Sequence, residues 1–249
     1  MNKKKIIFYL VFVFALLLGL NINSKAADDK YTADDFEILG DTVYGFSKSG
    51  VQKLKRNRNV VLPTKSKENV DLKKIASFAF VYNKSSAIDE YTQREGENGE
   101  VNNLDVDGNE IKKLGEDFHQ LDIESVEIPE GYTYIGQDAF EENSNIKSVN
   151  LPKTITKISD YAFAHLSLKT IKLPDNLKFL GDQVFFDNQI EGKLILPKNL
   201  TNLGERAFKS NQITDIEFNC EKLETIKEQA FQDNKIKQVK LPDSVKKIE

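Results

Sequence analysis

Phenylalanine recurs along this chain at a nearly constant spacing, with apolar residues at fixed distances around it. Six phenylalanines follow one another at 22, 23, 22, 23 and 23 residues, and Phe80 precedes them by 38 residues, one period plus an insertion. A period of about 20 to 50 residues is typical of a solenoid, in which each repeat buries its apolar side against its neighbours. We therefore expect stacked coils with one buried ring in each. The six residues are Phe118, Phe140, Phe163, Phe185, Phe208 and Phe231.

A short segment of alternating apolar and polar residues precedes each ring, as in Val149-Asn150-Leu151 before Pro152. Such alternation indicates a half-buried strand, and proline ends it because proline has no amide hydrogen to donate. Strands joined by connections one repeat long must pair in parallel. The pattern predicts a β-solenoid with one short parallel strand per repeat of about 23 residues. The strand-ending slot, 11 residues before each phenylalanine position, holds Pro129, Pro152, Pro174, Pro197, Cys220 and Pro242.

The second half of each repeat supplies the rest of the predicted core. An aliphatic residue stands five positions before the ring, and alanine usually stands directly before it, as Ile158 and Ala162 do for Phe163. Asparagine recurs three positions after the ring, where its amide can bond to the backbone of a turn. A row of ligand contacts is the alternative, which Leu121 and Leu166 in the same slot disfavour. The asparagines are Asn83, Asn143, Asn188, Asn211 and Asn234.

These aliphatic-Gly, Ala-Phe and strand-Pro signatures resemble the BspA-like class of bacterial leucine-rich repeats, found on many surface proteins. The resemblance extends over about Val60 to Glu249. It implies a leucine-rich-repeat β-solenoid. Because the family includes adhesins that attach to host matrix proteins, it also implies a binding role at the cell surface. Family members often carry cysteine where this chain has its periodic asparagine.

The first 26 residues have the composition of an export signal. A basic start is followed by an uncharged stretch from Ile6 to Leu20 that is short for a membrane span, and Ser24-Lys25-Ala26 offers small residues to a signal peptidase. We expect a signal peptide over residues 1–26, a secreted or cell-surface location, and no transmembrane segment after cleavage. An uncleaved anchor is the alternative.

Charge and cysteine content narrow the function further. The chain has 35 basic and 39 acidic residues, and removal of four lysines with residues 1–26 leaves 31 and 39, a net charge of −8. Such a surface argues against nucleic acid as a partner. The single cysteine, Cys220, excludes an internal disulfide. We expect a half-buried thiol there, with an intermolecular disulfide as the alternative.

Residues 27–59 are expected to form a lead-in and a cap, because the first coil of a solenoid needs a cover. Phe36 to Leu39 and Thr42 to Gly45 predict a hairpin, and Ser47 to Arg58 a short helix. The repeats then run over residues 60–249, interrupted by an acidic insertion loop at 84–110. The last repeat is incomplete, which suggests a longer protein or a cover by another molecule. The cations of the predicted helix could contact cell-wall polymers, although a solvated face is the commoner explanation: Lys53, Lys55, Arg56 and Arg58.

The outward residues of the predicted strands are the candidate contact surface for a protein partner. The alternative is a pair of solvated ladders, with Glu217 and Lys240 side by side, and neither column holds an aromatic anchor. One column contains Ser125, Ser148, Thr170, Lys193, Asp215 and Gln238. The other contains Glu127, Asn150, Lys172, Ile195, Glu217 and Lys240.

Three classes of function follow from these features. An exported binding module that recognises a host or matrix protein is favoured, and a structural spacer or display module within a longer surface protein is the alternative. An enzyme is the weakest reading, because His119 and His165 occupy different repeat positions and no phosphate loop or nucleophile-base pair is present. We expect no metal and no cofactor.

Overall fold

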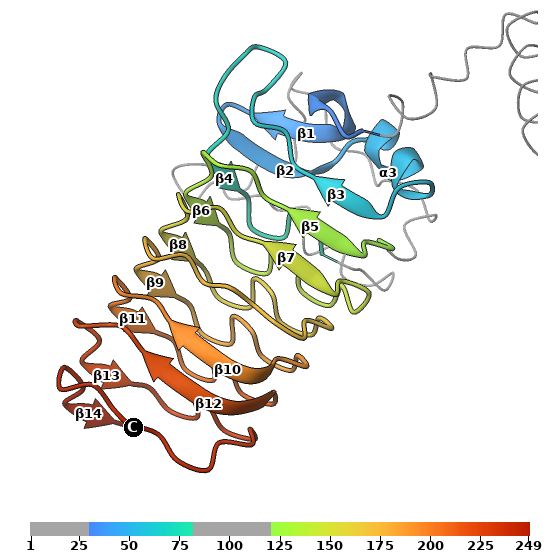
Figure 1. Ribbon diagram of the computed structural model, residues 1–249. Helices are drawn as coiled ribbons and strands as arrows, with labels where there is room; N and C mark the ends of the chain where they lie inside the picture. The colour runs from blue at the N-terminus through green and yellow to red at the C-terminus, as the bar shows by residue number, and fades with distance from the viewer. Residues whose placement is uncertain (1–29, 82–120) are drawn as a thin grey trace, which may run out of the picture. The chain divides into compact units, whose positions relative to one another are not determined.

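The computed structural model describes residues 30–81 and 121–249. Residues Tyr31–Glu249 form one compact unit, in which successive turns of chain stack as coils (Figure 1). The N-terminal elements are η1 (Ala33–Asp35), β1 (Phe36–Leu39), β2 (Thr42–Phe46) and α3 (Lys48–Leu54). The coils carry β3 (Asn59–Val61), β4 (Lys74–Ile75), β5 (Ser125–Glu127), β6 (Tyr134–Ile135), β7 (Ser148–Asn150), β8 (Lys157–Ile158), β9 (Phe179–Leu180), β10 (Glu191–Leu196), β11 (Asn202–Leu203), β12 (Gln212–Phe218), β13 (Thr225–Ile226) and β14 (Lys247–Ile248).

The coils are joined by parallel strand pairing, which confirms the predicted β-solenoid. Strands β3, β5, β7, β10 and β12 occupy the segments before the strand-ending slot, and we call them the proline-side ladder. Strands β4, β6, β8, β9, β11, β13 and β14 contain the aliphatic residue before the ring, and we call them the phenylalanine-side ladder. This second ladder was not predicted, because strands of two residues are too short to show alternation.

The proline-side ladder is interrupted. It forms one sheet of β3, β5 and β7 and another of β10 and β12, and residues 170–173 between them are not a strand. The strand predicted from Leu168 to Leu173 is therefore wrong, as is the one from Ile236 to Leu241. The first of these segments follows the turn in which Leu166 replaces asparagine, so that turn lacks the amide that binds neighbouring coils elsewhere.

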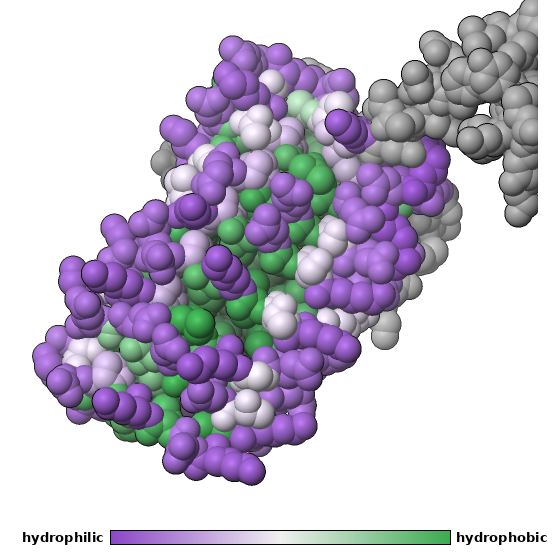
Figure 2. Space-filling view, in the orientation of Figure 1, coloured by the Kyte–Doolittle hydropathy of each residue, from purple (hydrophilic) through white to green (hydrophobic). Residues whose placement is uncertain are grey.

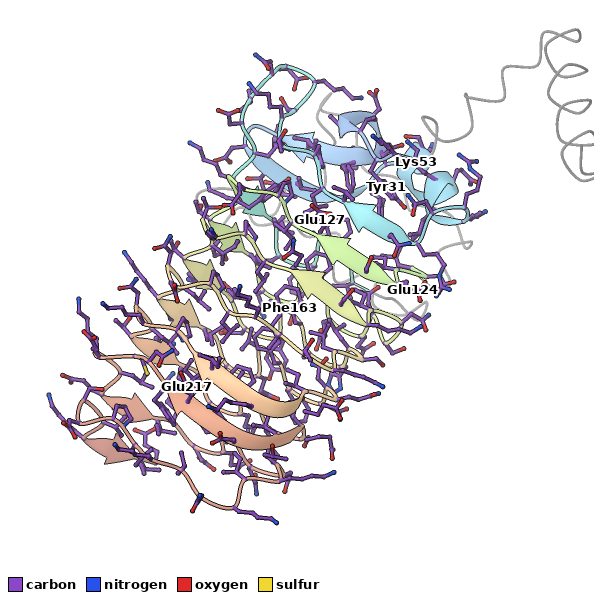
Figure 3. The ribbon with its side chains drawn as sticks, in the orientation of Figure 1. Tyr31, Lys53, Glu124, Glu127, Phe163 and Glu217 are labelled. Carbon is purple, nitrogen blue, oxygen red and sulfur yellow. The ribbon has the colours of Figure 1, made fainter. Side chains whose placement is uncertain are left out.

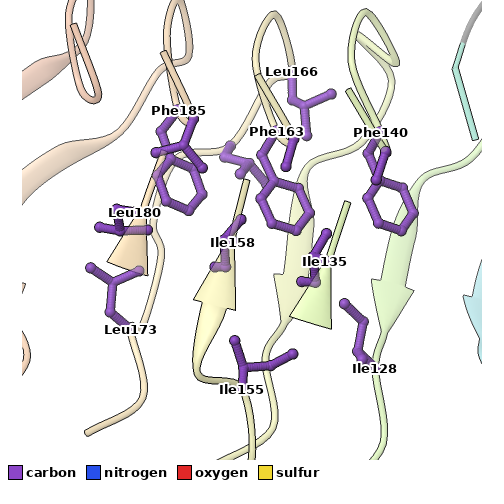
Figure 4. Close-up of a cluster of buried hydrophobic side chains, with 14 of the residues drawn as sticks. Ile128, Ile135, Phe140, Ile155, Ile158, Phe163, Leu166, Leu173, Leu180 and Phe185 are labelled. Atoms are coloured by element: carbon purple, nitrogen blue, oxygen red, sulfur yellow. The ribbon is translucent and has the colours of Figure 1, made fainter. Parts of the chain in front are cut away.

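The rings form a continuous stack through the core. Neighbouring centroids are 5.4 Å apart for Phe140 and Phe163, and 5.5 Å apart for Phe163 and Phe185, with nearly parallel planes (Figure 4). Phe208 and Phe231 continue the series. The rings of Phe140 through Phe208 are fully buried, so the predicted core is confirmed.

One ring is not where its spacing predicts. Phe80 stacks directly on Phe140 at 5.0 Å, and β3 and β4 pair directly with β5 and β6. Phe118 therefore does not stand between Phe80 and Phe140. Spacing counts residues along the chain and cannot tell which repeats are neighbours in space. Phe118, Asn83 and the loop predicted at 84–110 lie outside the described residues.

The periodic asparagines hold adjacent coils together, as the structural interpretation predicted. Asn211 is 1% exposed, and its Nδ2 donates to the carbonyl oxygens of Phe185 and Phe208 at 2.9 and 3.1 Å. Its Oδ1 accepts a hydrogen bond from the amide of Ile190 at 2.9 Å. Asn188 and Asn234 make the same contacts in their turns. Each asparagine thus satisfies backbone groups of two coils that would otherwise be buried without a partner.

The N-terminal hairpin and helix cover the first coil. Strand β2 pairs with β1 in antiparallel fashion and with β4 in parallel, so the hairpin extends the phenylalanine-side ladder. The Phe46 ring meets the Phe80 ring edge-on at 5.1 Å and so continues the aromatic stack. Helix α3 begins after the N-cap Ser47, whose side chain accepts from the Gly50 amide, and ends at Leu54 rather than at Arg58.

Candidate functional site

The proline-side ladder brings half of the predicted contact columns together. Ser125 lies beside Ser148, and Glu127 lies beside Asn150, on β5 and β7. On β10 and β12 the neighbours are Lys193 with Asp215 and Ile195 with Glu217. The remaining candidates, Thr170, Lys172, Gln238 and Lys240, are exposed but belong to no strand, so the columns are not continuous.

The charges in these columns are satisfied within the ladder. Lys193 Nζ lies 2.8 Å from Glu217 Oε2 and 3.7 Å from Asp215 Oδ2. The hydrogen bond from Lys193 lowers the pKa of Glu217, and the same bond raises the pKa of Lys193. The predicted neighbour of Glu217, Lys240, is replaced by Lys193 because the bulge at Gly192 shifts the register of β10.

The sequence missed the first members of both columns. Asn59 and Val61 on β3 lie beside Ser125 and Glu127, and the Ser125 hydroxyl donates to Asn59 Oδ1 at 2.7 Å. Val61 is exposed. The signal was available, since Val60-Val61-Leu62-Pro63 repeats the strand-Pro pattern.

Apolar residues gather around the interruption of the proline-side ladder. Figure 2 shows a band of hydrophobic residues along the face of Figure 1, with polar residues on both sides. Val149, Leu151 and Ile171 are only partly buried at the interruption, and Ile195 on β10 is 48% exposed. An exposed apolar patch with a polar rim is a common feature of protein contact sites.

The basic cluster of the cap is largely engaged within the protein. Lys53 Nζ lies 2.6 Å from the buried carboxylate of Asp35, and Figure 3 places Lys53 beside Tyr31 in the cap. Arg58 pairs with Asp122. Lys55 and Arg56 are exposed. The four cations therefore do not form a single solvent-facing cluster.

Two carboxyl groups in one turn of the stack have strongly raised pKa values. Asp138 is only 6% exposed, and burial, with the nearby charge of Asp160, raises its pKa to about 6. Burial raises the pKa of Glu141 to about 7, and the charges of Asp138 and Glu142 act in the same direction. None of the ion pairs between described residues includes either group.

The remaining chemical candidates do not form a reaction centre in the described part of the chain. Cys220 is 1% exposed rather than half-buried, and this burial raises the pKa of its thiol. His165 Nδ1 lies 3.0 Å from Asp187 on the surface, and His119 is outside the described residues. Residues 30–81 and 121–249 contain no group of three acidic, histidine or cysteine side chains suited to a metal. The same residues include no helix with the length and apolarity for crossing a membrane.

The fold and its outward columns define a leucine-rich-repeat solenoid. Residues 112–234 match the BspA type leucine rich repeat region in six copies. The repeat region therefore belongs to the BspA-type leucine-rich repeats, as the resemblance implied.

Solved structures show the same architecture. A T. pallidum leucine rich repeat protein (TpLRR) aligns with a TM-score of 0.60 and 17% identity over 88% of this chain and 86% of its own. A leucine-rich repeat protein from Bacteroides ovatus ATCC 8483 aligns with a TM-score of 0.50 and 19% identity, and this chain spans about half of it, 53%. At these identities the likeness shows the fold alone. No curated protein sequence matches the chain.

Proposed function

We propose that this chain is an exported bacterial cell-surface protein that binds a host or matrix protein through the proline-side ladder. The observation that carries the proposal is the apolar patch of Val149, Leu151, Ile171 and Ile195 within a polar, strand-supported face. Aliphatic residues at the centre of a polar rim are typical of protein contact surfaces. The composition of residues 1–26 supports export, and the BspA-type repeats support a binding role rather than an enzymatic one.

A structural spacer or display module is the second candidate. It is favoured by the internal pairing of Lys193 with Glu217 and by the bond from Ser125 to Asn59, because side chains already paired contribute little to a partner. Aromatic anchors are also absent from both predicted columns. A spacer needs no specific ligand, so the two functions differ in a measurable way.

Binding of the full chain to a panel of immobilised matrix proteins, measured by surface plasmon resonance, tests the proposal. We expect saturable binding to at least one of them, weakened about tenfold or more by Ile195→Asp. Val70→Asp is the matched control, since Val70 is 41% exposed but lies outside the ladder. Absence of saturable binding across the panel, or equal loss in both variants, would favour the spacer.

A further inference from the structure

The outer face of the phenylalanine-side ladder carries an aromatic, a lysine and a second aromatic residue in one row. Tyr134, Lys157 and Phe179 are direct neighbours on β6, β8 and β9. Lys157 Nζ lies 5.6 Å from the centre of the Tyr134 ring and 4.8 Å from the centre of the Phe179 ring. Both distances are within the range of cation–π attraction. The ammonium group is thus held between two rings while its side chain stays exposed.

This lysine has no carboxylate of its own in the described part of the chain. The ion pairs there leave out Lys157, Lys178 and Lys73, all of which are exposed. The proline-side ladder differs, because its exposed cations Lys193 and Lys147 both pair with acidic residues. The two faces of the solenoid therefore differ in how much positive charge they offer to a partner.

Holding Lys157 in place has a consequence for binding. A free lysine side chain loses about 1.5 to 2 kcal/mol of rotamer entropy when a partner fixes it. The two rings have already restricted Lys157, so a carboxylate that binds it meets a smaller ordering cost. Tyrosine is also among the residues that most often dominate protein interfaces. The row thus combines a pre-positioned cation with apolar contact area.

Two further lysines extend the charge along the stack. Lys73 and Lys178 stand in the adjoining row, which backbone hydrogen bonds connect through Thr133 and Thr156. Three strand steps of about 4.8 Å separate them, or roughly 14 Å. An extended peptide of about five residues covers that distance.

We propose that this row, with Lys73 and Lys178 beside it, docks an acidic, extended segment of a partner protein. Carboxylates of the segment pair with the three lysines, and its aliphatic stems lie against Tyr134 and Phe179. The surface is separate from the proline-side ladder. Its test therefore stands or fails independently of the matrix-protein binding proposed above.

Fluorescence anisotropy of a fluorescein-labelled peptide of eight glutamates, titrated with the full chain, tests this inference. We expect saturable binding that weakens with added salt, and no binding of the matching glutamine peptide. Lys157→Glu should weaken binding at least about tenfold. Lys172→Glu, an equal charge change at an exposed site on the other face, should weaken it less than about twofold.

The rings have their own test. The double variant Tyr134→Leu with Phe179→Leu keeps apolar bulk and all lysines, and we expect it to weaken binding about threefold or more because Lys157 is no longer held. Melting by circular dichroism checks that each variant folds, and Lys157→Gln replaces Lys157→Glu if the latter does not. Equal losses in the Lys157 and Lys172 variants would reduce the effect to overall charge and overturn the proposal. So would no binding of the glutamate peptide, or tighter Lys157-dependent binding of polygalacturonate, an acidic polysaccharide.

Discussion

Truncation of one stacked ring tests the energetic basis of the fold. Phe163 is fully buried, with parallel rings at 5.4 and 5.5 Å on its two sides. Phe163→Ala removes about 150 Å² of buried apolar surface. At about 25 cal/mol per Å² this loss costs about 4 kcal/mol, within the range of about 3 to 5 kcal/mol seen for buried Phe→Ala changes. The cavity is shared by two neighbouring coils, so neither can close it alone.

Urea unfolding of the full chain, followed by circular dichroism, measures this free energy. Phe186→Ala is the matched control, because Phe186 is the next aromatic along the chain from Phe185 but is only partly buried. We expect that control to lose less than about 2 kcal/mol. A Phe163→Ala chain that loses under about 1 kcal/mol, or no more than the control, would refute the stacked core.

Three further predictions concern the turns and the close contact of coils. Asn211→Leu should destabilise the protein by about 2 to 3 kcal/mol in urea unfolding, because carbonyls of two coils and the Ile190 amide lose their partner. Gly204→Ala should lower the melting temperature, since a Cβ there overlaps the Gly181 carbonyl oxygen. The raised pKa values of Asp138 (about 6) and Glu141 (about 7) lie above unfolded values of about 3.9 and 4.3. The free energy of unfolding should therefore fall as the pH rises from about 4 to about 7, relative to the Asp138→Asn, Glu141→Gln double variant, by about 1 to 2 kcal/mol.

Each of these predictions has an outcome that contradicts it. Full stability of Asn211→Leu would show that the asparagine row does not connect the coils. An unchanged melting temperature for Gly204→Ala would show that the coils do not approach so closely there. Parallel pH curves for wild type and the double variant between pH 5 and 7.5 would show that the two carboxyl groups are not buried.

The repeat could be predicted from the sequence because its markers are local and periodic. Phe163, Asn211 and the strand-ending prolines each occupy one slot per repeat, and the structure gives each slot one role. The phenylalanine-side ladder escaped notice because strands of two residues give no alternation. Its outward row was missed with it, although Tyr134 and Phe179 are the aromatic anchors that the predicted columns lack.

Other differences come from contacts between segments far apart in the chain. The pairing of Lys193 with Glu217 depends on a bulge at Gly192, which changes the register by an amount that the sequence pattern does not encode. The direct contact of Phe80 with Phe140 depends on which coils are neighbours, and residue spacing carries no such information. Burial of Cys220 follows from its strand-ending slot, in which Pro152, Pro174 and Pro197 are also buried.

The order of the rings along the stack is the most direct test of the account, because every surface described depends on it. Nuclear Overhauser effects between ring protons, recorded on the full chain with labelled phenylalanine, report which rings are neighbours. We predict cross-peaks linking Phe80 to Phe140, Phe140 to Phe163, and Phe163 to Phe185, whose centroids are 5.0, 5.4 and 5.5 Å apart. Cross-peaks from Phe118 to both Phe80 and Phe140, or none between Phe140 and Phe163, would contradict it.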